Sequence, residues 1–328
     1  MGTKSALITG ITGQDGSYLA DLLVAKGYRV YGLRRRLSVP NTTNIAHLLD
    51  RIGFVDGDLQ DVGSLIRALE VAQPDEVYNL AAQSFVGTSW QQPVLTGQVT
   101  ALGATNLLEA VRTVCPRARF YQASTSEMYG NSGDCPQNEG TAFHPRSPYG
   151  VSKLYAHHMT LNYRDSFGLF ACCGVLFNHE SPRRGLEFVT RKVTHAVARI
   201  KLGLQTDLTL GNLESQRDWG YAPEYVEAMW MMLQADTPCD YVIATGKSYA
   251  IRTWVETVFG VAGLDASRFV RVDKSLLRPA EISMLCGDAS RARRHLGWEA
   301  RSSLEELAQI MYEADLDRVR RGQLVEKA

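Results

Sequence analysis

The stretch that decides the fold lies near the start of the chain and reads Ser5-Ala6-Leu7-Ile8-Thr9-Gly10-Ile11-Thr12-Gly13-Gln14-Asp15-Gly16. Its first five residues predict a short buried strand, and Ser17–Lys26 predicts the helix that follows. The glycines between them allow a tight turn and a close approach of the backbone to a ligand, while the helix N-terminus offers free N–H groups. Such a triplet is also compatible with an ordinary turn. Its place after the first strand, ahead of further β–α units, favours a dinucleotide-binding turn.

Beyond this turn, short apolar runs alternate with amphipathic stretches of helical length, as in a parallel sheet covered by helices. Further strands are predicted at Arg29–Leu33, Gly53–Asp56, Glu76–Leu80, Arg119–Ala123 and Leu169–Phe177. Further helices are predicted at Asp61–Ala72, Thr96–Val114 and Tyr149–Phe167. The sequence therefore predicts an α/β fold with a Rossmann-type, doubly wound parallel sheet.

After Asn178 the predicted elements become shorter and mixed, and no linker is evident. Helices are predicted at Phe188–Leu202, Ala222–Gln234, Ile251–Val261 and Leu304–Leu316, and strands at Tyr241–Thr245 and Phe269–Val272. We expect residues 1–178 to form a Rossmann domain that carries the cofactor and the catalytic residues. Residues 179–328 are expected to form a smaller mixed α/β lobe that mainly binds substrate, with some crossing of the chain between the lobes.

The composition excludes some functional classes. Lysine plus arginine equals aspartate plus glutamate at 35 each, so no overall basic field attracts nucleic acid or an anionic membrane. An anionic ligand must then be met by local arginines. No run of 18 apolar residues predicts a membrane span. The six cysteines show no C-x-x-C spacing and the seven histidines no metal-binding pattern, so we expect reduced thiols, no metal and a cytoplasmic protein.

The end of the second predicted strand indicates which dinucleotide is bound. An NAD enzyme usually places an acidic residue there for the ribose hydroxyls, but this chain places Arg34, Arg35 and Arg36. Arginines form charge-assisted hydrogen bonds with a phosphate, so the run favours the 2′-phosphate of NADP. A solvated basic loop is the alternative reading. Asn79 to Ser84, after the fourth predicted strand, adds small residues to the sheet edge at which such folds bind ligands.

Tyr149 and Lys153 open a predicted helix and are four residues apart, so they share one helical face. A nearby ammonium favours the phenolate of a tyrosine, which can then take a proton from a substrate alcohol. The pair alone is common on protein surfaces. After a Rossmann half of this length, it predicts a catalytic site.

The segment Ser124–Gly130 follows the fifth predicted strand at the same sheet edge. It contains Thr125, whose hydroxyl suits alcohol oxidation, and Glu127, which that reaction alone does not need. Glu127 is either a loop carboxylate that caps a backbone N–H or a second base. As a second base it would remove a carbon-bound proton made acidic by a new neighbouring ketone.

These motifs resemble the extended short-chain dehydrogenase/reductase family, which modifies nucleotide sugars. Within it, the chain is most similar to the GDP-mannose 4,6-dehydratases, and the resemblance covers nearly the whole sequence. The runs that carry it are Gly10-x-x-Gly13-x-x-Gly16, Thr125-Ser126-Glu127, Tyr149-x-x-x-Lys153, Asn178–Gly185, Phe188–Lys192, Gly211–Leu213, Arg217–Gly220, Arg278-Pro279-x-Glu281, Gly287-Asp288 and Leu296–Trp298.

The resemblance implies a hydro-lyase that converts GDP-D-mannose to GDP-4-keto-6-deoxy-D-mannose with tightly bound NADP. Tyr149, with Lys153 and Thr125, would oxidise the 4-hydroxyl. Glu127 would then remove the proton at carbon 5 and assist the loss of water from carbon 6. An epimerase or 4-keto-sugar reductase of the same family, or a non-catalytic NADP-binding sensor, are the alternatives.

The resemblance also implies the residues that contact each ligand. For the cofactor they are Gly10, Thr12, Gly13, Gln14, Asp15, Gly16, Arg34, Arg35, Arg36, Asp58, Leu59, Leu80, Ala81, Ala82, Gln83, Tyr149, Lys153, Leu176, Asn178, His179 and Arg184. For GDP-mannose they are Ser84, Thr125, Ser126, Glu127, Tyr149, Asn178, Val189, Lys192, Leu210, Gly211, Asn212, Arg217, Arg278 and Glu281.

The chain departs from its family in a few places. Related glucose dehydratases have Asp before the catalytic Glu where this chain has Ser126, which favours the mannose branch. The loop 37–44 is less serine-rich than expected, and residues 45–58 are shortened. This region contacts a neighbouring subunit in relatives, so the resemblance implies a homo-oligomer, either a tetramer or a dimer. Tyr221 and Pro223 also replace commoner residues, without a functional interpretation.

Overall fold

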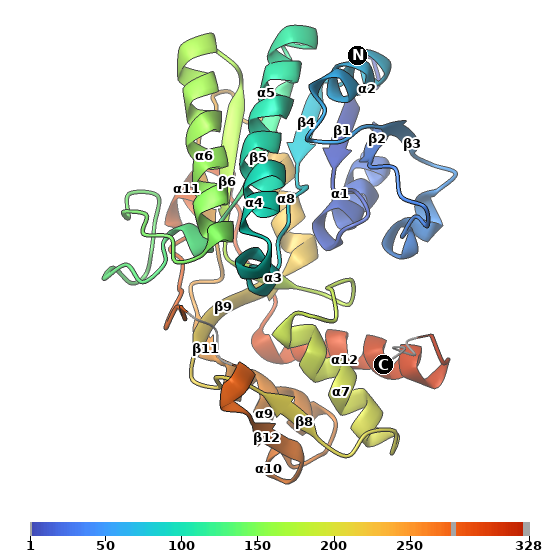
Figure 1. Ribbon diagram of the computed structural model, residues 1–328, viewed down its shortest axis with the longest axis vertical. Helices are drawn as coiled ribbons and strands as arrows, with labels where there is room; N and C mark the ends of the chain where they lie inside the picture. The colour runs from blue at the N-terminus through green and yellow to red at the C-terminus, as the bar shows by residue number, and fades with distance from the viewer. Residues whose placement is uncertain (1, 277–279, 324–328) are drawn as a thin grey trace.

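A parallel sheet of seven strands forms the larger part of the molecule (Figure 1). The computed structural model describes residues 2–276 and 280–323. The strand order is β10-β6-β5-β4-β1-β2-β3. The strands span Ser5–Thr9 (β1), Arg29–Arg34 (β2), Gly53–Asp56 (β3), Glu76–Asn79 (β4), Arg119–Thr125 (β5), Ala171–Leu176 (β6) and Tyr241–Ile243 (β10). The predicted Rossmann-type, doubly wound sheet is confirmed, since the strand order reverses between β1 and β4.

Helices cover both faces of this sheet because its strands are buried on both sides. The core on one face includes side chains of α1 (Gln14–Ala25) and α8 (Ala222–Gln234). The core on the other face includes side chains of α2 (Val62–Ala72), α5 (Gly103–Val114) and α6 (Pro148–Phe167). Two of these elements, α8 and β10, come from beyond residue 178, so the chain returns to the large sheet after leaving it.

The remaining elements pack around a second apolar core at the other end of the molecule (Figure 1). Its main helices are α7 (Val189–Lys201), α9 (Ile251–Val261) and α12 (Leu304–Arg320). A three-stranded sheet has the order β11-β9-β7, and β12 pairs with β8. These strands span Asn178–Glu180 (β7), Leu208–Leu210 (β8), Gln216–Tyr221 (β9), Ser248–Ala250 (β11) and Val270–Val272 (β12).

The structure differs from the sequence-based expectations in several elements. Helix α1 begins at Gln14, before the predicted Ser17, because Gly13 serves as its N-cap. The predicted helix Thr96–Val114 contains π-helical turns at Gly97–Leu102 before α5. Strands β7, β8, β9 and β11 were not predicted. Most have only three residues, too few to show an alternating pattern.

The short elements complete the chain. They are α3 (Val86–Gln91), α4 (Pro93–Thr96), α10 (Ala266–Phe269), α11 (Ser290–Leu296), the 3₁₀ turns η1 (Thr43–Leu48), η3 (Ser126–Met128) and η4 (Lys274–Leu276), and the π-helical turn η2 (Gly97–Leu102). Among the described residues no helix is long and apolar enough to cross a membrane.

Candidate functional site

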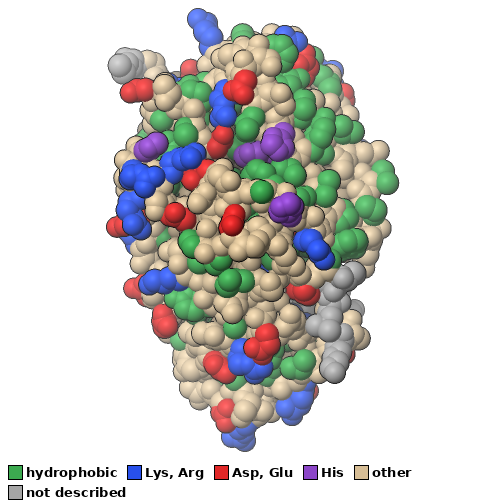
Figure 2. All heavy atoms as spheres, turned by 90° about the vertical axis from the view of Figure 1, so that its left-hand side faces the viewer, with side chains coloured by type: hydrophobic (Ala, Val, Ile, Leu, Met, Phe, Trp, Pro, Cys, Tyr) green, Lys and Arg blue, Asp and Glu red, His purple; other side chains and the backbone are tan. Residues whose placement is uncertain are grey.

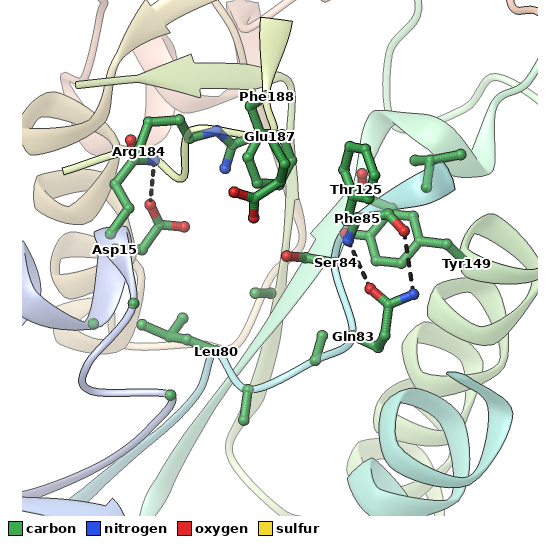
Figure 3. A pocket seen from close by; sticks show the side chains of 18 of the residues that line it. Asp15, Leu80, Gln83, Ser84, Phe85, Thr125, Tyr149, Arg184, Glu187 and Phe188 are labelled. Atoms are coloured by element: carbon green, nitrogen blue, oxygen red, sulfur yellow. Dashed lines mark hydrogen bonds between the residues drawn. The ribbon is translucent and has the colours of Figure 1, made fainter. Parts of the chain in front are cut away.

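A cavity of about 920 Å³ lies at the carboxyl edge of the seven-stranded sheet. One side is formed by loops that follow β1, β2, β4 and β5, and the other by residues of β7, α7, β8 and β9. Figure 3 shows Leu80 and Gln83 on one side of the cavity and Arg184 and Glu187 on the other. The carboxyl edge next to a reversal of strand order is where open α/β sheets bind ligands. The volume is in the upper range of small-molecule sites, which suits two ligands side by side.

The glycine-rich turn is built so closely that side chains are excluded. Gly10 has a φ of +71°, and a Cβ there would come within 2.9 Å of the Ala81 nitrogen. A Cβ on Gly16 would overlap the Gly10 carbonyl oxygen. These two positions require glycine, and the turn leaves the first N–H groups of α1 facing the cavity side of the sheet. The residues fit a dinucleotide pyrophosphate, because a phosphate needs backbone donors that no side chain covers.

A buried chain of polar groups ties the neighbouring loops together. The Thr9 hydroxyl donates to Asn79 Oδ1 at 2.7 Å and accepts from the Leu80 and Ala81 nitrogens at 3.1 Å. The Asn79 amide donates to Gln122 Oε1 at 2.8 Å. Thr9 and Asn79 end β1 and β4, and Gln122 lies within the neighbouring strand β5, so the network fixes the loops after β1 and β4 relative to each other and to β5.

The predicted arginine run divides into residues inside and outside the cavity. Arg34 and Arg35 line it, whereas Arg36 is exposed and does not. Arg34 already donates from Nε to Asp56 at 3.1 Å, and its guanidinium lies 5.2 Å from the Phe54 ring centroid. The prediction that all three arginines contribute is therefore unsupported for Arg36. Arg36 lies two residues beyond the end of β2, in an exposed segment, and its side chain does not reach the cavity.

Tyr149, Lys153, Thr125 and Glu127 all line the cavity where the two sides meet. Ser147 caps helix α6 by accepting from the Gly150 nitrogen at 3.0 Å, and Pro148 occupies the first turn. This start places Tyr149 in the first turn, with Lys153 one turn later on the same face. The Lys153 ammonium donates to the Ala123 carbonyl at 2.7 Å and lies 5.9 Å from the Tyr149 ring centroid.

Burial shifts the pKa of both groups. It raises the pKa of Tyr149 well above its usual value, against the opposing effect of a hydrogen bond with Thr125. Burial also lowers the pKa of Lys153 to about 8, although the Asp15 carboxylate opposes it. In this arrangement the Tyr149 phenol is neutral at physiological pH. It becomes a base only when further positive charge lies close to it.

Asp15 and His179 form a largely buried ion pair that joins the two sides of the cavity. His179 Nε2 lies 2.8 Å from Asp15 Oδ2, and Nδ1 lies 2.7 Å from the Phe177 carbonyl oxygen. Because both partners only accept hydrogen bonds, both ring nitrogens must carry a proton. Burial disfavours the imidazolium, but the Asp15 carboxylate outweighs it and raises the pKa of His179. Burial likewise opposes ionisation of Asp15, yet His179 lowers the pKa of Asp15 to about 2.

The substrate side gathers charged and polar side chains from separate segments. The Lys192 ammonium donates to the Thr209 carbonyl at 2.9 Å, and the Arg217 guanidinium donates to the Ile282 carbonyl at 2.9 Å. Asn212 donates to the Ser215 hydroxyl at 2.7 Å, which in turn donates to Glu281 at 3.3 Å. These contacts bring together positions separated by up to 89 residues along the chain, from Lys192 to Glu281.

Nearly all of the predicted site residues line the cavity. In addition to those above, they are Thr12, Gly13, Gln14, Asp58, Leu59, Leu80, Ala82, Gln83, Ser84, Ser126, Leu176, Asn178, Arg184, Val189, Leu210 and Gly211. Arg278 lies outside the described residues.

Sequence reasoning missed Phe85, Glu187 and Phe188, which also line the cavity. The Phe85 and Phe188 rings meet edge to face at 5.5 Å between centroids. Phe188 opens the run Phe188–Lys192 that carries the family resemblance, which was the available signal for it. Among the described residues no cluster of three His, Cys, Asp or Glu side chains is arranged to hold a metal ion.

Comparison with known proteins agrees with this geometry. The family profile described as GDP-mannose 4,6 dehydratase matches residues 7–311. GDP-mannose 4,6 dehydratase 1 of Arabidopsis thaliana is 50% identical over 342 aligned positions, which cover 99% of this chain and 93% of that protein. The GDP-mannose 4,6-dehydratase of Yersinia enterocolitica is 48% identical, with 98% of this chain and 96% of that protein covered. Both alignments are longer than the 328 residues of this chain, so these relatives contain residues that it lacks.

Solved structures of similar proteins extend over the same length. The structure of RMD from Pseudomonas aeruginosa complexed with NADPH has a TM-score of 0.81 and 25% identity, covering 96% of this chain and 100% of the other. The full-length relatives and the family profile together show that this chain belongs to the GDP-mannose 4,6-dehydratase family, within the extended short-chain dehydrogenase/reductase group.

Proposed function

We propose that this protein is an NADP-dependent GDP-mannose 4,6-dehydratase, a hydro-lyase that forms GDP-4-keto-6-deoxy-D-mannose and water. The observation that carries the proposal is the position of the Glu127 carboxylate in the same cavity as Tyr149 and Lys153, next to a glycine-rich turn. A plain alcohol dehydrogenase needs no such carboxylate, whereas a dehydratase needs a base for the proton at carbon 5.

The cofactor is held by the first turn of α1 and by the loops after β2 and β4. The glycines of this turn, Gly10, Gly13 and Gly16, leave backbone N–H groups open to the pyrophosphate. Arg34 and Arg35 lie at the end of β2, where a 2′-phosphate binds in folds of this type. When bound, the dinucleotide would supply the hydride acceptor for oxidation at carbon 4 and the hydride donor for reduction at carbon 6.

The chain's own residues move the protons. Tyr149 takes the proton of the 4-hydroxyl while Thr125 orients that group, once the positive charge of the oxidised cofactor lies close to the phenol. Glu127 then removes the carbon-5 proton, which the new 4-ketone has made acidic, and protonates the departing 6-hydroxyl so that it leaves as water. As hydride returns to carbon 6, carbon 5 takes up a proton again, which balances the proton that Tyr149 removed from the 4-hydroxyl. The guanosine diphosphate lies along Lys192, Asn212, Arg217 and Glu281.

The proposal is tested by incubating the protein with GDP-mannose and a catalytic amount of NADP⁺. The expected result is a 4-keto sugar nucleotide with no net accumulation of NADPH. A stoichiometric build-up of NADPH contradicts it. The alternative epimerase or 4-keto-reductase activity is not favoured, because the full-length relatives are named GDP-mannose 4,6-dehydratases. Cytoplasmic location stays a prediction.

A homo-oligomer belongs to the same proposal. The side chains of Trp90, Val94, Leu102 and Val151 are 40% to 71% exposed on α3, α4, η2 and α6. Figure 2 shows hydrophobic side chains gathered along one margin of the larger lobe, while charged side chains of both signs are dispersed elsewhere on that face. A contiguous apolar surface of this kind marks a protein interface. Analytical ultracentrifugation of wild type and Val151→Asp tests it, with dissociation of the variant as the expected outcome.

A further inference from the structure

Glu187 presents a carboxylate to the cavity that the proposed mechanism does not use. It lies in the loop between β7 and α7, and its oxygens are directed into the cavity from the side opposite Thr125 and Tyr149 (Figure 3). Its carboxylate makes no hydrogen bond or ion pair with another residue of the described ranges 2–276 and 280–323. A charged acceptor held in a ligand cavity without a protein partner is available to the ligand.

The local sequence positions this carboxylate. A Cβ on Gly185 would come within 2.6 Å of Glu187 Oε1 and closer still to Oε2, so the carboxylate occupies the space that glycine leaves free. The next residue, Phe188, is fixed by its edge-to-face contact with Phe85 and by the Arg184 guanidinium 3.5 Å from its ring centroid. The loop therefore aims Glu187 inward, although its side chain is exposed to solvent on the cavity side.

Charge decides which part of the ligand can face Glu187. A pyrophosphate is repelled by a carboxylate and fits beside the cations Lys192 and Arg217 instead. The neutral parts of a nucleotide sugar, the nucleoside and the hexose, carry groups that donate hydrogen bonds to a carboxylate. Glu187 faces Thr125 and Tyr149 across the cavity, where the hexose reacts, so the donors nearest to it are the hexose hydroxyls. Of these hydroxyls, the reaction changes the ones at carbons 4 and 6, which must face Tyr149 and Glu127. Those at carbons 2 and 3 remain unchanged and free for recognition.

We propose that Glu187 accepts hydrogen bonds from the 2- and 3-hydroxyls of the hexose and so determines specificity for the sugar. This inference rests on the proposed function, since it assumes a GDP-hexose substrate. Glu187 acts on the sugar and not on the nucleotide. It holds the ring from the side opposite the catalytic groups and directs carbons 4 to 6 toward Tyr149 and Glu127.

The test compares binding of GDP and of GDP-mannose to the full chain, by calorimetry in the presence of NADPH, which cannot accept hydride. For Glu187→Ala, GDP-mannose should bind roughly 10- to 100-fold more weakly while GDP changes by less than about twofold, as expected for one charge-assisted hydrogen-bonding group. Glu187→Gln keeps an acceptor oxygen and should lose less. Gly185→Ala should resemble Glu187→Ala, because the added methyl displaces the carboxylate but keeps its charge in the protein.

Glu70→Gln is the matched control, since it removes one exposed carboxylate from α2, outside the cavity. Equal losses for GDP and GDP-mannose, or no loss for either, would overturn the role of Glu187. Wild-type protein that binds GDP-mannose no more tightly than GDP would overturn it as well. Failure of the proposed function is recognised separately, as wild-type protein that binds GDP-mannose with NADP⁺ but forms no 4-keto product.

Discussion

The two sides of the cavity are built in different ways. The cofactor side uses one contiguous turn, Gly10–Gly16, and loops that end neighbouring strands of a single sheet. The substrate side uses isolated side chains, among them Lys192 on α7, Arg217 on β9 and Glu281 after η4. The first side presents backbone N–H groups, and the second presents side chains held by carbonyl oxygens of other segments.

This difference explains how each side depends on the rest of the fold. A backbone anion site needs only a tight turn and a helix N-terminus, which local sequence provides. A side-chain site forms only when the fold brings several distant segments together. Each of its cations supplies a separate contact, so the loss of one leaves the others in place. We therefore expect mutations where the two sides meet to have the largest effects, and mutations of single side chains at the periphery to have the smallest.

Replacement of Tyr149 by Phe should have the largest effect on activity. It removes the group that transfers the proton of the 4-hydroxyl, so kcat should fall by roughly 10³- to 10⁴-fold while GDP-mannose still binds. Formation of the 4-keto product and calorimetric binding measure the two quantities. Tyr155→Phe is the control on the same helix, because Tyr155 is exposed and its hydroxyl lies 3.4 Å from the Thr105 hydroxyl, outside the cavity. Full activity of Tyr149→Phe would favour a non-catalytic NADP-binding protein.

Replacement of Glu127 by Gln should separate oxidation from dehydration. The first hydride transfer does not need this carboxylate, but removal of the carbon-5 proton does. Turnover should therefore fall by roughly 10²- to 10³-fold. Bound NADPH should then accumulate in a single turnover, which its near-ultraviolet absorbance reports. A variant that keeps full activity would favour an epimerase or a 4-keto reductase instead.

The Asp15–His179 ion pair joins the two sides of the cavity and should contribute to the free energy of unfolding. His179→Gln leaves the Asp15 carboxylate partly buried without its cation and should lower the free energy of unfolding by about 3 kcal/mol at pH 6. Because the folded-state pKa of His179 is raised, its contribution is fully present below pH 6.5 and is lost as the pH rises through the folded value. The loss caused by the mutation should therefore shrink at pH 9.

Denaturant titrations at both pH values measure this effect. His47→Gln is the matched control, since His47 pairs with Asp21 at 2.7 Å on the surface and should contribute less than about 1 kcal/mol. The contribution of Asp15 has the opposite dependence, being fully present above the ordinary pKa of 3.8 and lost as the pH falls through its folded pKa of about 2. A pH-independent loss in His179→Gln would show that this histidine is neutral.

Replacement of Arg35 by Ala should have the smallest effect. It removes a charge-assisted contact with the 2′-phosphate, so the dissociation constant for NADP should rise by roughly 10-fold while that for NAD stays unchanged. Fluorescence titration of both dinucleotides measures it. Arg36→Ala is the control, because Arg36 lies outside the cavity. An equal effect of both variants would mean that net charge, and not position, selects NADP.

The sequence predicted the cofactor side in more detail than the substrate side. The glycines of Gly10–Gly16 and the Tyr149–Lys153 pair are local signals, and each lies in the element expected for it. The resemblance to a family, and not periodicity, supplied Lys192, Arg217 and Glu281. Neither local patterns nor the family resemblance identified Glu187, because a single glutamate in a loop forms no sequence pattern. Its role is visible only from the structure, in which the space beside Gly185 holds its carboxylate at the cavity.

The sequence by itself determined the strand–turn–helix at residues 5–25, the composition without a basic field, and the helical spacing of Tyr149 and Lys153, because each depends on neighbours within a few residues. Only the tertiary structure decided that Arg36 lies outside the cavity. It also decided that Tyr149 is buried, which raises the pKa of its phenol. It also decided that His179 faces two acceptors, Asp15 and the Phe177 carbonyl. These properties depend on solvent exposure and on charges from distant segments, which the chain acquires only when it folds.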